Sequence, residues 1–427
     1  MTTLLKNGNV FLDGAFRKSD LILKGDKLFV FDSSQACSKD LDSVIELDNK
    51  FILPGFADVH VHFREPGFSY KETIKSGSMA AARGGYTHVC TMPNLNPAPS
   101  TPDALKVQLE IIQRDSCVHI TPYGAITLNQ DGRSELARME ELAPYVCAFT
   151  DDGKGVQAGH LMADAMRLAK SLGKLIVAHC EDESLIGGTA IHDGKLAKLM
   201  GIKGISSESE WRQVERDVEL AAKIGCGYHV CHVSTKESVD IIRQAKKSEI
   251  DVTCETAPHY LLLCDMDLED EGRFKMNPPI RDVSDKEALL EGLTDGTVDM
   301  IATDHAPHSA EEKSKGLLGS AFGIVGLETA FPLLYTNLVL KNKVITFEKL
   351  IDLMAVNPRK RFNLPGGTIR DGGAADICIW DLDKSAKISC DDFASMGKAT
   401  PFEGNEVVGK LIRTFVDGVS VYQYPTA

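Results

Sequence analysis

The chain has 427 residues, which is enough for one large domain with a smaller one attached. Its net charge of −14 argues against nucleic acid and anionic membranes as partners, because an acidic surface repels phosphates. No apolar run approaches the ~20 residues of a membrane-spanning helix, and the first residues lack the pattern of a signal peptide, so we expect a cytoplasmic protein.

Short strands are predicted first, over residues 3 to 53. The run Leu21–Phe31 has the apolar pattern of a hairpin, with Gly25 and Asp26 at the turn. This flank is too short to fold well alone, so we expect it to pair with another part of the chain.

Between residues 56 and 364, apolar strand-like runs alternate with amphipathic helical stretches. The helical stretches include 158–172, 211–224 and 236–245. Counting the run that ends at His60, there are about eight strand candidates. The others cover 86–91, 117–124, 146–150, 175–179, 227–233, 251–256 and 300–303. Alternating strands and helices in this number predict an α/β fold, a (β/α)8 barrel of the TIM type.

Short strands return after Pro365, at 375–380 and over 409–421, where Asp417 and Gly418 form a turn signal. We expect this second flank to pair with the first, since each is too short to fold well apart. The expected division is a β-sandwich from residues 1–54 and 365–427 and a catalytic barrel from residues 55–364.

His60 and His62 are the strongest chemical signal in the chain. One residue separates them, so on a strand their side chains point the same way. Two parallel imidazoles at a strand end offer half of a metal site. Arg64 follows in a loop, which would place a guanidinium beside that metal.

Further residues of metal-ligand types fall at the ends of other strand candidates. They are Asp151 or Asp152, His179, His232 and Asp304. Each of them alone has an ordinary structural explanation, such as a buried histidine or an aspartate that caps a turn. In a barrel, however, working residues gather at the carboxyl ends of the strands, and all of these fall there.

The neighbours of these histidines are expected to face away from the site. His229 lies three residues before His232, and Cys180 and Cys231 are immediate neighbours of ligand candidates on strands whose side chains alternate. The 11 cysteines are scattered and form no Cys-x-x-Cys, which predicts reduced, buried thiols.

Four histidines and two carboxylates suit two zinc-like ions that share one carboxylate. Such binuclear sites hold a bridging oxygen, and a water bound there can lose a proton at about pH 7. A carboxylate beside that hydroxide can take its proton and pass it to a leaving nitrogen. The predicted chemistry is hydrolysis of an amide-like bond, or the reverse reaction.

Longer motifs surround these residues throughout the barrel region. They are Asp58–Gly67, Gly84–Thr87, Thr91–Asn94, Phe149–Gly153, Ala178–Glu181, Cys231–Ser234, Glu255–His259, Asn277–Arg281, Thr303–His308 and Phe322–Thr329. In these motifs the chain resembles the dihydroorotases of the cyclic amidohydrolase superfamily, in the long bacterial group. The resemblance implies two Zn²⁺ ions per chain and the reversible cyclisation of N-carbamoyl-L-aspartate to L-dihydroorotate in pyrimidine synthesis.

The resemblance also implies how the ligands are shared between the two ions. One ion would be held by His60, His62 and Asp304, and the other by His179 and His232. Asp304 would also act as the general acid and base, accepting a proton from the bridging hydroxide and delivering it to the departing amide nitrogen.

A carboxylate would bridge the two ions. Many relatives use a carboxylated lysine, but in this group an aspartate takes its place, and Asp151 and Asp152 are the candidates. We choose Asp152, because strand alternation lets only one of the two reach the metals. Lys154 is a third candidate, in the loop beyond Gly153.

Arg64, Asn94 and His308 would bind the carboxylate of the substrate, and Asn277 would contact its ring. A guanidinium fork matches a carboxylate geometrically. Without the resemblance, these four would be ordinary loop and turn residues. His305 is expected to support its loop, and His259 is given no role.

Residues 309–320 follow Asp304 and are polar, so they could form a lid over the site or a solvated surface loop. The chain departs slightly from the family pattern near this region. Ala321 stands where a proline is usual, and Tyr260 and Met276 also replace commoner residues.

Two alternatives remain open at this point. A hydantoinase or allantoinase would share the barrel and metals, but those enzymes usually carry the lysine bridge and have no Arg-Asn-His carboxylate site. A non-catalytic subunit that holds aspartate transcarbamoylase would have lost ligands, whereas all proposed ligands are present here. The family further implies a homodimer, with aspartate transcarbamoylase as a candidate partner.

Overall fold

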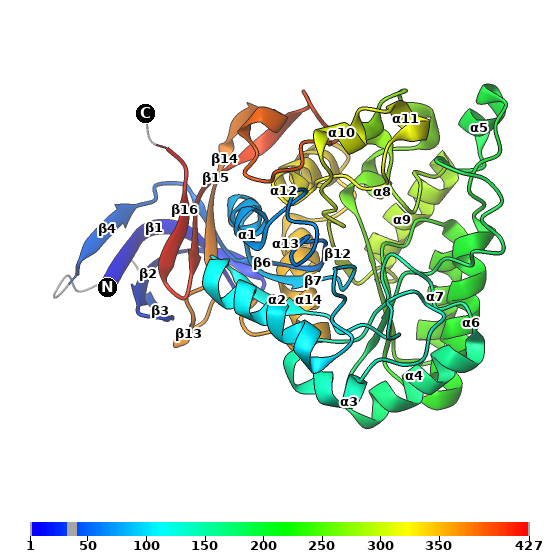
Figure 1. Cartoon of the computed structure of the whole chain (residues 1–427). Helices are drawn as coiled ribbons and strands as arrows, with labels where there is room; N and C mark the ends of the chain where they lie inside the picture. Colours follow the sequence, from blue (N-terminus) through cyan, green and yellow to red (C-terminus); the bar gives the residue numbers. More distant parts are fainter. Residues whose placement is uncertain (1, 32–40, 426–427) are drawn as a thin grey trace.

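A ring of parallel strands forms the centre of the molecule (Figure 1). The computed structural model describes residues 2–31 and 41–425. Its central strands are β6 (Phe56–Val61), β7 (Tyr86–Thr91), β8 (His119–Pro122), β9 (Ile176–Ala178), β10 (Tyr228–Val230), β11 (Val252–Thr256) and β12 (Met300–Ile301). Strands β6 to β8 form one parallel sheet, and strands β9 to β12 form another.

Single bridges join these two sheets into a closed barrel. Phe149 pairs with Gly124, just after β8, and with Ile176 of β9. At the other seam, Val61 of β6 pairs with His305, just after β12. The predicted (β/α)8 barrel is therefore confirmed, but the strand predicted at 146–150 is reduced to bridges at Phe149.

The three helical stretches that the sequence predicted are confirmed as α4 (Gly159–Ser171), α6 (Glu208–Ile224) and α7 (Lys236–Lys247). The buried sides of α4 and α7 are mostly apolar, as expected of amphipathic helices around a barrel, whereas α6 also buries Glu210, Gln213 and Asp217. Thr235 begins α7 by accepting a hydrogen bond from the Ser238 backbone N–H.

The remaining α-helices cover the rest of the barrel and its upper face (Figure 1). They are α1 (Ile74–Arg83), α2 (Pro102–Asp115), α3 (Met139–Leu142), α5 (Lys195–Met200), α8 (Pro258–Leu262), α9 (Val283–Asp295), α10 (Ala310–Lys313), α11 (Gly316–Gly319), α12 (Ala330–Leu334), α13 (Phe347–Ile351) and α14 (Asn357–Phe362). Within residues 2–31 and 41–425, every helix is too short or too polar to cross a membrane.

Both ends of the chain build one nine-stranded sheet beside the barrel, where the blue and red strands of Figure 1 meet. Its strands are β1 (Thr2–Leu12), β2 (Ala15–Lys24), β3 (Lys27–Phe31), β4 (Ser43–Glu46), β5 (Phe51–Pro54), β13 (Gly373–Ala374), β14 (Ile377–Lys387), β15 (Glu406–Val416) and β16 (Val419–Gln423). The antiparallel pair β5–β14 joins the two ends.

The flanks therefore pair as predicted, within one continuous sheet. The predicted turns at Gly25 and Gly418 connect β2 to β3 and β15 to β16, and both glycines have positive φ. The sheet encloses an apolar core that includes Leu21, Ile52 and Phe415. The division of the chain at residues 54 and 365 stays a prediction. The ten cysteines of the described residues are free, and Cys37 lies outside those residues.

Candidate metal centre and active site

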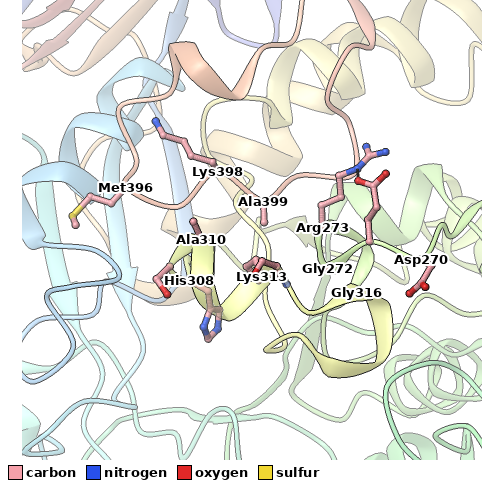
Figure 2. Close-up of a pocket in the computed structure, with 13 residues that line it drawn as sticks. Asp270, Gly272, Arg273, His308, Ala310, Lys313, Gly316, Met396, Lys398 and Ala399 are labelled. Atoms are coloured by element: carbon pink, nitrogen blue, oxygen red, sulfur yellow. Dashed lines mark hydrogen bonds and ion pairs between the residues drawn. The ribbon is translucent and has the colours of Figure 1, made fainter.

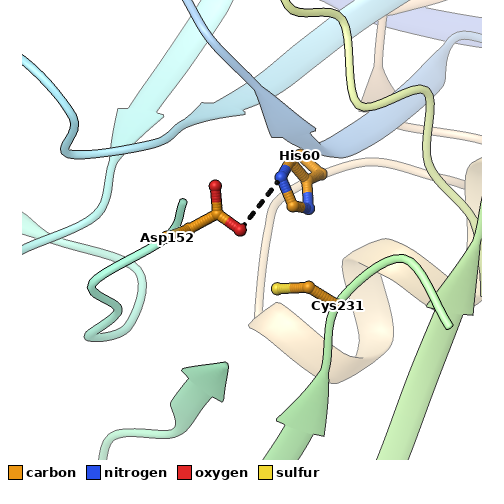
Figure 3. Close-up of side chains that lie close together, drawn as sticks. All are labelled: His60, Asp152 and Cys231. Carbon is orange, nitrogen blue, oxygen red and sulfur yellow. Dashed lines mark ion pairs between the residues drawn. The ribbon is translucent and has the colours of Figure 1, made fainter. Parts of the chain in front are cut away.

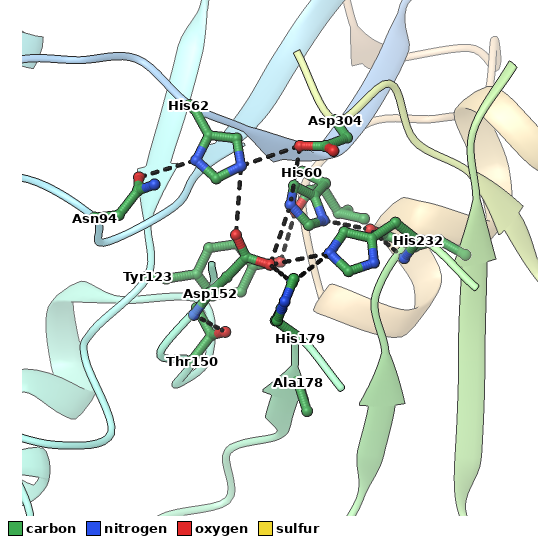
Figure 4. Close-up of polar contacts among 12 residues, drawn as sticks. His60, His62, Asn94, Tyr123, Thr150, Asp152, Ala178, His179, His232 and Asp304 are labelled. Atoms are coloured by element: carbon green, nitrogen blue, oxygen red, sulfur yellow. Dashed lines mark hydrogen bonds and ion pairs between the residues drawn. The ribbon is translucent and has the colours of Figure 1, made fainter. Parts of the chain in front are cut away.

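The histidines and aspartates predicted as ligands converge at the carboxyl ends of the barrel strands (Figure 4). His60 Nε2 lies 3.4 Å from Asp152 Oδ1 and 3.5 Å from Asp304 Oδ1. His62 Nε2 lies 3.1 Å from Asp304 Oδ1 and 3.4 Å from Asp152 Oδ2. His60 lies within β6 and His62 follows that strand, and both histidines face the same pair of carboxylates.

The other two histidines lie beside Asp152 Oδ1, the oxygen that His60 also faces. His232 Nε2 is 3.3 Å, and His179 Nδ1 is 3.7 Å, from Asp152 Oδ1. The same two ring nitrogens are 2.9 Å apart. Asp152 thus presents Oδ2 to His62 and Oδ1 to His60, His179 and His232, so this one carboxylate faces all four histidines.

Several buried polar atoms of this cluster have no hydrogen-bond partner among the described residues. They include His60 Nε2 and Asp152 Oδ1. Buried polar atoms are almost always hydrogen-bonded, so atoms without partners point to a missing ligand. His60, His62 and Asp304 place their ligand atoms within 4.8 Å of one another, as do Asp152, His179 and His232. Imidazole nitrogens and carboxylate oxygens are zinc donors, so this set fits two divalent ions.

The charges of the cluster favour bound cations. Burial raises the pKa of Asp152, but the neighbouring imidazoles, His60 foremost, outweigh burial and hold it well below its usual range. Asp304 behaves similarly, with the hydrogen bond from His62 as the main opposing cause. Burial lowers the pKa of His60, yet Asp152 and Glu255 outweigh it and raise that pKa. The carboxylates are therefore ionised and attract positive charge into the site.

The other two candidates for the bridge lie elsewhere. Asp151 Oδ1 accepts hydrogen bonds from the backbone N–H groups of Ile126 (2.8 Å) and Thr127 (3.0 Å), so this carboxylate anchors the loop after β8. Lys154 is exposed, and its Nζ lies 3.9 Å from Glu183 Oε1. Of the three candidates for the bridge, Asp152 is the one that lies against the ligand histidines.

Cys231 corrects one expectation. Its sulfur lies within 4.8 Å of ligand atoms of His60 and Asp152, instead of facing away (Figure 3). The reason is that His232 has a φ of 31°, so the chain leaves the extended conformation and the strand alternation ends. Burial raises the pKa of the Cys231 thiol, which disfavours a thiolate ligand. Cys180 does face away, 3.3 Å from the Tyr228 hydroxyl.

Three ligand histidines have polar partners behind them. His62 Nδ1 lies 2.9 Å from Asn94 Oδ1, and His60 Nδ1 lies 2.6 Å from Glu255 Oε1. His179 Nε2 lies 3.5 Å from Glu181 Oε2. Both glutamates belong to the motifs Ala178–Glu181 and Glu255–His259, in which no role was predicted for them. For Glu255 a signal existed, because a charged residue inside a fully buried barrel strand needs a partner.

A cavity of about 360 Å³ opens above the cluster and brings the predicted substrate residues together. It is lined by Arg64, Asn94, Asn277 and His308 as well as by metal ligands. Arg64 is buried, and its Nε donates a hydrogen bond to Pro307 O (3.2 Å). Burial lowers the pKa of its guanidinium to about 10. Asn277 donates to Glu181 Oε1 at 3.1 Å, and its buried Oδ1 has no partner within the described chain.

His308 stands at the edge of this cavity, held from both sides. Its Nε2 lies 3.4 Å from Arg64 Nη2, and its Nδ1 lies 3.1 Å from Glu312 Oε2. Glu312 also pairs with Lys71 at 2.9 Å. Burial and the Arg64 charge lower the pKa of His308 to about 3, so its ring is neutral in this arrangement.

The polar segment 309–320 is an ordered structure that contains α10 and α11. Lys313 Nζ donates to the carbonyl oxygens of Lys275, Ala321 and Gly323 at 2.7–3.0 Å, which ties the segment to the body of the protein. A second cavity of about 380 Å³ lies against this segment, with His308 and Lys313 in its wall (Figure 2).

The two remaining histidines of the motifs have separate surroundings. His305 Nδ1 accepts from the Gly326 N–H at 3.2 Å, in agreement with the expected support of its loop. His259 is buried, and its ring lies 4.2 Å from that of Tyr260. Tyr260 donates to Pro278 O at 2.6 Å and so anchors the loop that carries Asn277.

Comparison with known proteins gives one family from two kinds of match. The model of the family described as Dihydro-orotase-like matches residues 49–238. The chain is 49% identical to a dihydroorotase of Fusobacterium nucleatum and 48% identical to one of Enterococcus faecalis, with 98% of each chain covered in both comparisons.

Solved structures with the same fold include a hydantoinase and a dihydropyrimidinase. The L-hydantoinase of Arthrobacter aurescens superposes with a TM-score of 0.86 at 25% identity, covering 99% of this chain and 96% of that chain. The dihydropyrimidinase of Brevibacillus agri also gives a TM-score of 0.86, at 22% identity. The second likeness shows the fold alone.

Proposed function

The chain belongs to the dihydroorotase family, and from this premise we propose that it interconverts N-carbamoyl-L-aspartate and L-dihydroorotate in pyrimidine synthesis. The observation that carries the proposal is the shared cavity in which Arg64 and His308 lie beside the Asp152 cluster. Such a cavity can hold a small molecule that has both a carboxylate and a cyclic amide.

We propose that two Zn²⁺ ions occupy the cluster. His60, His62 and Asp304 would hold one ion, His179 and His232 the other, and Asp152 would bridge them. When bound, the ions would polarise the amide carbonyl of the substrate and lower the pKa of a nearby water. The mixed nitrogen and oxygen donors favour zinc, although other divalent metals accept the same donors.

Asp304 is the proposed general acid and base. In the ring-opening direction, it takes a proton from the attacking water and delivers it to the ring nitrogen as the C–N bond breaks. Its position 3.1 Å from His62 Nε2 places it inside the cluster and at the wall of the cavity. The reverse transfer serves ring closure.

Substrate orientation falls to other residues that line the cavity. Arg64 would bind the substrate carboxylate with its guanidinium, together with the side-chain NH₂ of Asn94, whose oxygen faces His62. His308 would complete this site, and Asn277 Oδ1 would accept from a ring N–H. Fixing both ends of the substrate contributes mainly through orientation.

Hydantoinase activity is the alternative that the fold likeness allows. The buried Arg64 beside His308 favours a substrate that carries a carboxylate. The decisive experiment measures turnover of dihydroorotate, hydantoin and allantoin by the purified chain, as isolated, after chelation and after addition of Zn²⁺. Metal-dependent turnover of dihydroorotate alone is expected; turnover of hydantoin alone would overturn the proposal.

Three further proposals rest on family membership. They are a homodimer, a cytoplasmic location and an association with aspartate transcarbamoylase. Sedimentation of the purified chain tests the first, and co-purification of transcarbamoylase activity from a cell extract tests the last.

A further inference from the structure

Behind His60, a file of polar side chains runs down the interior of the barrel. Thr253 and Glu255 are two residues apart on β11, so their side chains lie on the same face of that strand. His229 of the neighbouring strand β10 lies opposite Thr253 in the strand register. Glu255 is 1% exposed and His229 is fully buried. Barrel interiors are usually filled by branched apolar side chains, and burying polar ones is costly unless each is paired.

Every member of this file is paired, and the pairs determine where the protons lie. Glu255 Oε1 is 2.6 Å from His60 Nδ1, and Glu255 Oε2 is 3.2 Å from His229 Nε2. Because a carboxylate only accepts, both imidazole nitrogens must be donors. His229 Nδ1 is then an acceptor and receives the Thr253 hydroxyl hydrogen bond at 2.8 Å.

This pattern has a direct consequence for the metal centre. With its proton on Nδ1, His60 keeps a free lone pair on Nε2, the nitrogen that faces Asp152 and Asp304. The Glu255 carboxylate also makes that lone pair more basic, which strengthens a metal bond. By contrast, His62 has the neutral amide of Asn94 behind it.

Glu255 is separated from the substrate. The residues that line the active-site cavity include Asn94 and Glu181 but not Glu255, among the residues that the structure describes. Within the described part of the chain, its side chain hydrogen-bonds to His60, to His229 and to the His232 backbone N–H at 3.4 Å. Glu255 is therefore not placed to bind the substrate.

We propose that Glu255 is a positioning residue that fixes His60 as a metal ligand, and that His229 and Thr253 hold Glu255 in place. The inference rests on the proposed function only in that it takes the cluster as a metal site. The unpaired Nε2 of His60 and the hydrogen bonds of Glu255 to two histidines support it independently of the reaction.

The test is a zinc titration of the metal-free protein. Each variant is stripped with a chelator, titrated with Zn²⁺ against a competing dye, and analysed for zinc content per chain. Glu255→Gln is expected to bind at least one ion 10- to 100-fold more weakly, the usual cost of losing such a partner. His229→Gln should weaken binding less, and Thr253→Val least, because each lies one bond further from His60.

Asp217→Asn is the matched control. Asp217 is a fully buried carboxylate of α6 that is bonded to Arg216 and Tyr228 and does not contact the ligands. It should keep wild-type zinc affinity even if the metal-free protein becomes less stable. A role of Glu255 in packing alone would likewise lower stability and leave the zinc affinity unchanged.

Wild-type affinity for both ions in Glu255→Gln would overturn the inference. If that variant fails to fold without metal, as judged by circular dichroism, His229→Gln decides, and wild-type affinity there would overturn it equally. Failure of the proposed function would appear separately, as a wild-type protein that binds zinc but does not turn over dihydroorotate.

Discussion

The carboxyl end of the barrel and the core of the nine-stranded sheet are both buried, but the first contains polar side chains and the second apolar ones. The sheet core contains apolar side chains such as Leu21, Ile377 and Phe415, each at most 2% exposed. The barrel end buries His60, Asp152 and other polar groups, some without partners in the described chain.

This difference separates stability from function. Apolar burial in the sheet contributes directly to folding, because it removes hydrophobic surface from water. Buried, unpaired polar groups cost free energy and persist only where a ligand or a reaction needs them. A substitution in the sheet core should therefore lower stability and leave activity unchanged, whereas a substitution at the barrel end should lower activity and leave stability unchanged.

Asp304→Asn should give the largest loss of activity. Removing the general acid and base is expected to lower kcat by about 10²- to 10⁴-fold, the usual contribution of such a group. Zinc content and the free energy of unfolding should be retained, because the amide keeps the shape of the carboxylate. Steady-state kinetics with elemental analysis checks this, and activity within tenfold of wild type would refute the role of Asp304.

Leu21→Ala should do the reverse. Leu21 is fully buried in the sheet core, so the cavity left behind should lower the free energy of unfolding by about 2–5 kcal/mol. Urea denaturation measures this change. The kcat at low temperature should match wild type, and a large loss of kcat in folded protein would contradict the separation of the two regions.

Arg64→Met should have a smaller effect, confined to substrate binding. Loss of a hydrogen bond to a charged group costs about 1.5–3 kcal/mol, which corresponds to a roughly 10- to 100-fold higher KM. The kcat should change much less than KM. An unchanged KM for dihydroorotate would remove Arg64 from the carboxylate site.

The smallest predicted effect concerns His119, the first residue of β8, which joins the barrel to the sheet flank. His119 of β8 lies 3.4 Å from Asp376 and 3.4 Å from Asp417, both in the sheet flank. Its hydrogen bond to Asp376 is the main cause that raises its pKa. A raised pKa in the folded state adds stability that is full below the unfolded value of about 6.5 and is lost as pH rises through the folded value.

His119→Gln should remove that pH dependence. The difference in unfolding free energy between wild type and the variant should be largest near pH 6 and should shrink toward pH 8. Urea denaturation at both pH values measures it, and an equal difference at both would show that the ion pair contributes nothing.

Local patterns predicted much of the site. The spacing of His60 and His62 required a common direction on a strand, and His179, His232 and Asp304 could be placed at strand ends by counting strands. Alternation required that only one of Asp151 and Asp152 reach the metals, and the hydrogen bonds of Asp151 to the loop after β8 agree with the choice of Asp152.

Alternation failed where the backbone left the extended conformation. Cys231 was expected to face away, yet a positive φ at His232 brings both side chains to the centre. The strand predicted at 146–150 became isolated bridges from Phe149 to Gly124 and to Ile176. Neither outcome can be derived from residue types alone.

The sequence by itself determined the barrel, the pairing of the two flanks and the residue types at the metal centre, because periodicity and spacing are local properties. Only the tertiary structure decided which side chains lie behind them. Glu255 is 195 residues from His60 along the chain, and their 2.6 Å contact exists only because closing the barrel brings β6 and β11 around one interior. Partners across a closed sheet depend on the register of every strand between them.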